Sequence, residues 1–100
     1  MRSPIQEQEI AKRLGGKVTP GSGAGMEKGD VRVKGKLRVE CKTTTKKSFS
    51  VTVKMLEKIE LEAVSCGEDP ALVVEFLDEG GKVLQQVAIV PMRVLEELSQ

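Results

Sequence analysis

Apolar and polar residues alternate along the chain in patterns that predict a mixed succession of helices and strands. Apolar residues three and four apart predict helices, and short Val- and Leu-rich runs between turn residues predict strands. The resulting order is α-β-β-β-α-β-β-α, with a short first strand. Helices are predicted at residues 4–14 and 53–65 and from Pro91 onward, and strands at residues 17–19, 30–33, 37–42, 71–77 and 83–90. We therefore expect one α/β domain over residues 1–100, with a central mixed sheet flanked by helices.

The first predicted helix carries a carboxylate in the middle of its apolar face. The buried stripe of this helix consists of Ile10, Ala11 and Leu14, and the next glycines end the helix. Glu7 falls within this stripe, whereas Glu9 points to solvent. A carboxylate on a buried face is unfavourable unless a partner stabilises its charge, and the alternative is a glutamate that reaches solvent at the helix end. Ser3 and Gln6 are predicted to form a capping box at the helix start.

Two acidic residues are expected to face each other across a β-hairpin. A turn at Lys34-Gly35-Lys36 joins two strands, so an antiparallel hairpin centred on Gly35 pairs Asp30 with Glu40. Cross-strand partners hold their Cβ atoms about 5 Å apart, and like charges at that separation are destabilising unless a divalent cation lies between them. Strand alternation places Lys42 on the face of Glu40 and points Cys41 the other way. This set predicts a metal-dependent phosphodiester site, and the alternative is a solvated charged hairpin.

The net charge of +1 conceals a strong segregation of charge along the chain. Residues 28–47 contain eight Lys/Arg and two acids, a net +6, whereas residues 48–100 contain four Lys/Arg and ten acids, a net −6. The positive block surrounds the predicted site, as expected for a phosphate-binding surface, and a solvated face is the alternative. The chain has no Trp or Tyr and only two Phe, so recognition through backbone and shape is favoured over base stacking.

Composition excludes several kinds of chemistry. The chain has no histidine and two distant cysteines, which excludes histidine base catalysis, a zinc ligand set and a disulfide framework. It contains no apolar run long enough to cross a membrane, and the sequence starts without an apolar signal region. We therefore expect a cytoplasmic protein, in the host cytoplasm if it is viral, with no membrane partner and no small-molecule cofactor.

The order of these features resembles the PD-(D/E)XK nuclease superfamily, in which an Asp opens one strand and Glu-x-Lys lies on the next. The motif here reads Gly29-Asp30 and then Glu40-Cys41-Lys42, with glycine in place of the proline. It is preceded by a helix with Glu7 and a Gly/Ser-rich segment, and it is followed by a basic Thr/Ser loop. Along nearly its whole length the chain is similar to the archaeal and phage Holliday junction resolvases.

This resemblance implies a structure-selective DNA endonuclease that uses Mg²⁺, with Mn²⁺ able to substitute, and hydrolyses paired phosphodiesters in four-way (Holliday) junctions. It implies that Asp30 and Glu40 bind the metal and that Lys42 assists catalysis. Further ligands would be the backbone carbonyl of Cys41 and the carboxylate of Glu7. The Gly/Ser-rich segment contains Ser22, which matches a serine required in the resolvases, and the alternative is a flexible loop. The expected DNA contacts are Ser22, Lys28, Arg32, Lys34, Lys36, Lys46 and Lys47.

A symmetric homodimer is expected, because two cuts of like polarity require two sites related by a two-fold axis. An apolar surplus near the C-terminus would supply part of the interface, and the alternative is that these residues only complete the core. They are Val87, Ile89, Val90, Met92, Val94, Leu95 and Leu98. The alternative functions are another PD-(D/E)XK nuclease, such as a virus-type replication-repair nuclease or a nickase, a non-catalytic DNA-binding module, and a small interaction domain.

Overall fold

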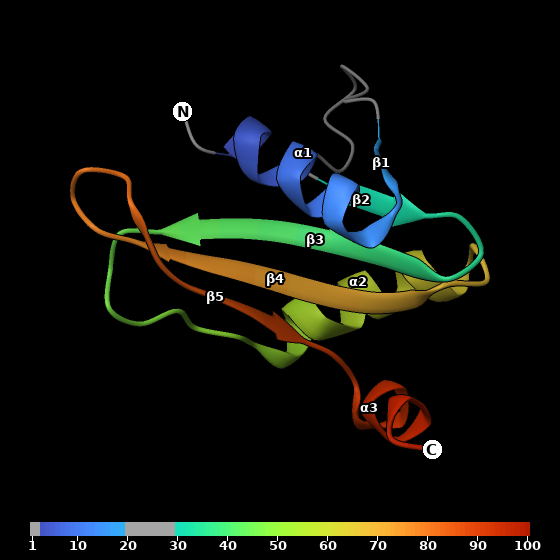
Figure 1. Ribbon diagram of the computed structural model, residues 1–100. Helices are drawn as coiled ribbons and strands as arrows, with labels where there is room; N and C mark the ends of the chain where they lie inside the picture. The colour runs from blue at the N-terminus through green and yellow to red at the C-terminus, as the bar shows by residue number, and fades with distance from the viewer. Residues whose placement is uncertain (1–2, 20–29) are drawn as a thin grey trace.

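The structure, a computed structural model, describes residues 3–19 and 30–100. It confirms the predicted order of elements (Figure 1). The helices are α1 (Ser3–Leu14), α2 (Val53–Val64) and α3 (Met92–Leu98). The strands are β1 (Lys17–Val18), β2 (Asp30–Val33), β3 (Leu37–Thr44), β4 (Asp69–Leu77) and β5 (Val83–Ile89). In these two ranges, no helix has the length and apolar character needed to cross a membrane.

The described strands form a single mixed sheet in the order β1-β2-β3-β4-β5. β3 and β4 are parallel, and the neighbouring pairs β1–β2, β2–β3 and β4–β5 are antiparallel. A parallel pair needs a crossover, which α2 provides between β3 and β4. β3 is two residues longer than predicted, because Thr43 and Thr44 continue the ladder with Glu75 and Phe76 of β4.

The two longer helices lie on opposite faces of the sheet (Figure 1). α1 packs on a cluster that includes Val31, Val39 and Cys41, and α2 packs through Ile59 on Leu72 and other residues of the opposite face. β4 is covered on both faces, which explains its nearly uninterrupted apolar sequence. Since Val39 and Cys41 point toward α1, the intervening position of β3 points toward the α2 face.

Three predicted core positions differ in the structure. Leu14, expected in the buried stripe of the first helix, is 41% exposed, and Leu56, whose helical spacing in the second helix also predicts burial, is 39% exposed. Glu7 is half-buried, and the fully buried polar residue of α1 is instead Gln6. The buried face of α1 is therefore rotated toward Gln6, Ile10 and Ala11.

Two glycines fix the backbone around the β2–β3 hairpin. Gly35 has φ +77° in the turn that joins the strands, a conformation that glycine adopts readily. Gly16 follows α1 and lies against β2, where an added Cβ would be 2.5 Å from the carbonyl oxygen of Arg32. Because Gly16 has no side chain, the end of α1 can lie close to the hairpin.

Candidate active site

The hairpin has the register that the sequence predicts. Asp30 of β2 pairs with Glu40 of β3, and the pairing continues with Arg32 opposite Arg38. The side chain of Asp30 lies outside the described part of the chain, but its backbone position is set by this ladder. This register makes Asp30 and Glu40 direct cross-strand partners, as the sequence predicts.

Glu40 and Lys42 form an ion pair on the α2 face of β3. Their Oε2 and Nζ atoms are 3.3 Å apart, and the Glu40 side chain is 16% exposed while that of Lys42 is 42% exposed. A partly exposed pair of this kind stabilises the fold by at most about 1 kcal/mol. The arrangement places an ammonium group beside a largely buried carboxylate that remains reachable from solvent.

Glu7 approaches Glu40 from α1. Its carboxylate is half-buried, and this burial raises the pKa of Glu7 above its ordinary value. The negative charge of Glu40 raises the pKa of Glu7 further, so the two carboxylates lie close enough to repel each other. Glu9, in contrast, is exposed. The structure therefore pairs Glu40 with Lys42 directly and relates Glu7 to Glu40 through charge repulsion, whereas Glu9 is exposed.

Gln6 fastens α1 to the strand that carries Glu40. Its Nε2 donates a hydrogen bond of 3.0 Å to the backbone carbonyl of Lys42, and its side chain is fully buried. Its Oε1 is buried without a hydrogen-bond partner among the described residues. The predicted capping box with Ser3 is therefore wrong, because the side-chain amide of Gln6 forms its hydrogen bond with β3 and not with the start of α1. This bond attaches the part of α1 that carries Glu7 to β3.

The ligand chemistry of this neighbourhood fits a hard cation. Glu7 and Glu40 supply carboxylate oxygens, which Mg²⁺ prefers, and the register adds Asp30 from the facing strand. Cys41 directs its side chain into the core, and its backbone lies in the ladder opposite Val73. Within residues 3–19 and 31–100, no three acidic or cysteine side chains already converge as a metal-holding group. The third carboxylate would have to come from Asp30.

The predicted DNA-contacting residues do not all lie beside this site, because the hairpin turn is at the end of the β2–β3 ladder away from the Asp30–Glu40 pair. Ser22 and Lys28 lie outside the described residues. Lys34 and Lys36 are exposed in the hairpin turn, and Lys46 and Lys47 are exposed in the loop after β3. In that loop, the backbone N–H of Lys46 donates to Thr44 Oγ1 at 3.0 Å.

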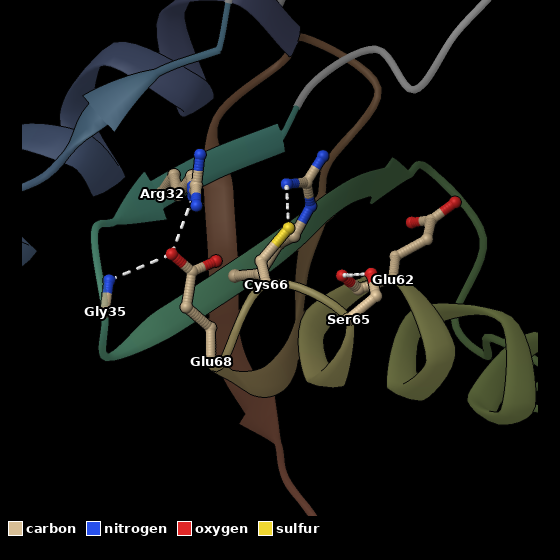
Figure 2. Close-up of polar contacts among 7 residues, drawn as sticks. Arg32, Gly35, Glu62, Ser65, Cys66 and Glu68 are labelled. Carbon is tan, nitrogen blue, oxygen red and sulfur yellow. Dashed lines mark hydrogen bonds and ion pairs between the residues drawn. The ribbon is translucent and has the colours of Figure 1, made fainter.

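Arg32, the remaining predicted DNA contact, is committed to a cluster that the sequence did not reveal (Figure 2). Its Nε lies 2.6 Å from Oε2 of Glu68, and the same oxygen accepts the backbone N–H of Gly35 at 2.9 Å. Arg38 Nη1 contacts Cys66 Sγ at 3.8 Å in the same region. This cluster attaches the hairpin turn to the loop between α2 and β4.

The environment of Glu68 keeps it ionised. Burial alone would raise the pKa of Glu68, but the hydrogen bonds from Gly35 and Arg32 and the charges of Arg32 and Arg38 outweigh burial and lower it. A loop glutamate separated by 36 residues from its partner carries no local sequence signal. The clustering of Arg32 and Arg38 on one strand pair was the sole hint that an acid would lie nearby.

Comparison with known proteins adds no relative. No family model matches the chain, and neither the curated proteins nor the solved structures contain a significant match.

Proposed function

We propose that this protein is a metal-dependent endodeoxyribonuclease that resolves four-way DNA junctions. The observation that carries the proposal is the pairing of Asp30 with Glu40 in a hairpin whose second strand also presents Lys42. The charge of Glu40 also acts on the half-buried carboxylate of Glu7. Neighbouring carboxylates repel each other in the absence of a cation, so their grouping on one sheet is best explained by a bound divalent metal.

Asp30, Glu40, Glu7 and the carbonyl of Cys41 would hold Mg²⁺ or Mn²⁺. When bound, the metal supplies a Lewis acid for the phosphate and lowers the pKa of a water nucleophile. The ammonium of Lys42 stabilises negative charge that develops on the phosphate or orients the attacking water. Glu40 holds that ammonium in place through the 3.3 Å ion pair. Gln6 keeps α1 on β3 and so keeps the Glu7 carboxylate at the site.

The decisive test is cleavage of a synthetic mobile four-way junction in Mg²⁺, compared with duplex, flap and single-stranded DNA. A junction resolvase introduces paired cuts in strands of like polarity at the junction centre. Equal cutting of the control DNAs would instead favour another PD-(D/E)XK nuclease. Junction binding without any cutting, in Mg²⁺ and in Mn²⁺, would favour a non-catalytic DNA-binding module.

Glu7→Gln is expected to reduce junction cleavage by roughly 10² without unfolding the protein, because it removes a charge placed next to Glu40. Glu9→Gln is the matched control, since Glu9 lies on the same helix but is exposed. Single-turnover cleavage rates and thermal unfolding measure the two effects. Greater sensitivity at Glu9 than at Glu7 would contradict the assigned site.

The homodimer proposal is supported by apolar surface that one chain leaves uncovered. Among the C-terminal residues named above, Val94 is buried in the core of the single chain and does not contribute to exposed apolar surface. Three others on α3 are largely exposed. These are Met92 at 65%, Leu95 at 51% and Leu98 at 76%. An open pocket of about 860 Å³ lies between α1, the sheet and α3 and is lined by Ile10, Leu14, Ala71, Val73, Val94 and Leu98.

Light scattering at micromolar concentration is expected to give twice the 10.9 kDa mass of one chain. Leu95→Glu combined with Leu98→Glu should give the single-chain mass, because two carboxylates would have to be buried on association. Leu61→Glu is the matched control, since Leu61 is 72% exposed on α2. A single-chain mass for the unmodified protein, with junction resolution intact, would refute the dimer.

A further inference from the structure

Glu40 and Lys42 open into a pocket whose other wall is α2. This pocket has a volume of about 450 Å³ and is lined by Glu40, Lys42, Thr52, Lys54, Met55, Lys58 and Ile59. Ile59 is buried against Leu72 and Val74, the β4 partners of Glu40 and Lys42 in the parallel ladder. The first turns of α2 therefore run alongside the part of β3 that carries the candidate site.

Lys54 and Lys58 occupy one flank of α2. Residues four apart in a helix lie one turn apart on the same side, so the two ammonium groups are neighbours. On the opposite flank of α2, Glu60 pairs with Arg93 at 3.1 Å and faces α3. Glu62 lies four residues after Lys58 and shares its side of the helix, but none of the acids of α2 lines the pocket, whereas both lysines do.

The pocket has an excess of positive charge. Three ammonium groups surround one carboxylate, and that carboxylate is already paired with Lys42. The N-terminus of α2 adds partial positive charge, with Thr52 as its cap accepting the N–H of Met55 at 3.1 Å. Lys54 and Lys58 are exposed at this opening, and their spacing in the sequence is compatible with a solvated or a DNA-facing side of the helix. Their position next to Glu40 was not visible in the sequence, because it depends on the α2 crossover.

We propose that Lys54 and Lys58 form a phosphate subsite that holds the nucleic-acid backbone next to the phosphodiester at Glu40 and Lys42. The inference rests on the proposed function and deepens it by naming the wall along which the substrate strand runs. A DNA strand carries one phosphate per nucleotide, so a strand with one phosphate at Lys42 presents a neighbouring phosphate to the adjacent wall of the pocket. Lysine contacts to phosphate position the strand and carry no base information.

The test measures DNA affinity as a function of salt in EDTA, where a metal-dependent nuclease can bind without cutting. Lys54→Ala combined with Lys58→Ala is expected to weaken binding roughly tenfold at low salt and to reduce the salt slope by about two, one unit per lost phosphate contact. Lys54→Arg combined with Lys58→Arg should restore both quantities. Lys12→Ala combined with Lys82→Ala is the control, because both lysines are exposed and lie outside the pocket.

Each outcome decides between this inference and the proposed function. An unchanged slope in the alanine variant, with junction cleavage by the unmodified protein intact, would overturn the subsite and leave the nuclease function standing. A reduced slope in a protein that binds four-way junctions but never cuts them would support the subsite and overturn the nuclease. Failure of the unmodified protein to bind any DNA would overturn both.

Discussion

Glu40→Gln is expected to abolish junction cleavage while junction binding persists. The substitution keeps the shape of the side chain but removes the charge that would hold a metal between β2 and β3. The rate should fall by more than roughly 10³, since losing a single stabilising group at an active site already costs about 10²–10³. Asp30→Asn is expected to have the same effect, because Asp30 is the register partner of Glu40.

The fold should tolerate Glu40→Gln. The lost ion pair with Lys42 is partly exposed and contributes at most about 1 kcal/mol. Glu57→Gln is the matched control, an exposed acid on α2 that does not line the pocket of Glu40. Cleavage rates, junction affinity and thermal unfolding of the two variants separate loss of metal binding from loss of structure. Near-normal cleavage by Glu40→Gln would remove the basis of the proposed site.

Glu68→Ala is expected to destabilise the fold by about 3 kcal/mol at pH 7, because it removes two charge-assisted hydrogen bonds and leaves Arg32 without its buried partner. The side chain of Glu68 is fully buried, whereas that of Arg32 is 34% exposed and can regain water, which keeps the loss at the lower end of the range for buried pairs. Urea unfolding measures the loss. Glu79→Ala, in the exposed β4–β5 turn, is the control and should change stability by less than about 0.5 kcal/mol.

The stabilisation of the fold by Glu68 should also depend on pH and should decrease on acidification. Its folded-state pKa is lowered from the ordinary 4.5, so the unfolded chain binds the proton more readily than the folded chain does. The stabilisation is therefore fully present above the ordinary value and is lost as the pH falls through the lower folded pKa. The stability difference between the unmodified protein and Glu68→Gln should shrink below pH 4.5, and a difference that grows on acidification would contradict the assignment.

The sequence was sufficient for those features that local patterns determine. The turn at Gly35 and the alternation of apolar residues along β3 specify the Asp30–Glu40 register, and the observed ladder has it. The glycines after α1 and α2 end those helices close to the predicted residues, with positive φ at Gly15 and Gly67. Each of these features depends on residues that are close together in the chain.

Features that depend on distant residues were predicted less well. The helical wheel of α1 predicted that Glu7 lies in the middle of the buried face. In the structure Gln6 is the buried polar residue instead, because its side chain donates a hydrogen bond to the carbonyl of Lys42. The attachment of Glu68 to the hairpin, like the approach of Lys54 to Glu40, depends on how α2 crosses between β3 and β4. A helix pattern predicts which residues share a flank, but it does not predict what that flank faces.

The covering of β4 on both faces has a consequence for how the protein tolerates change. β3 and β4 are paired on both edges, so their backbone amides should exchange with solvent deuterium only when the whole domain unfolds. The hairpin turn and the loop after β3 are exposed and should exchange through small local openings. Substitutions at Lys34, Lys36, Lys46 or Lys47 can therefore alter what the surface attracts without moving the strand that carries Glu40. The paired strand that carries Glu40 is thus separate from the exposed turn and loop, where new binding specificities can evolve.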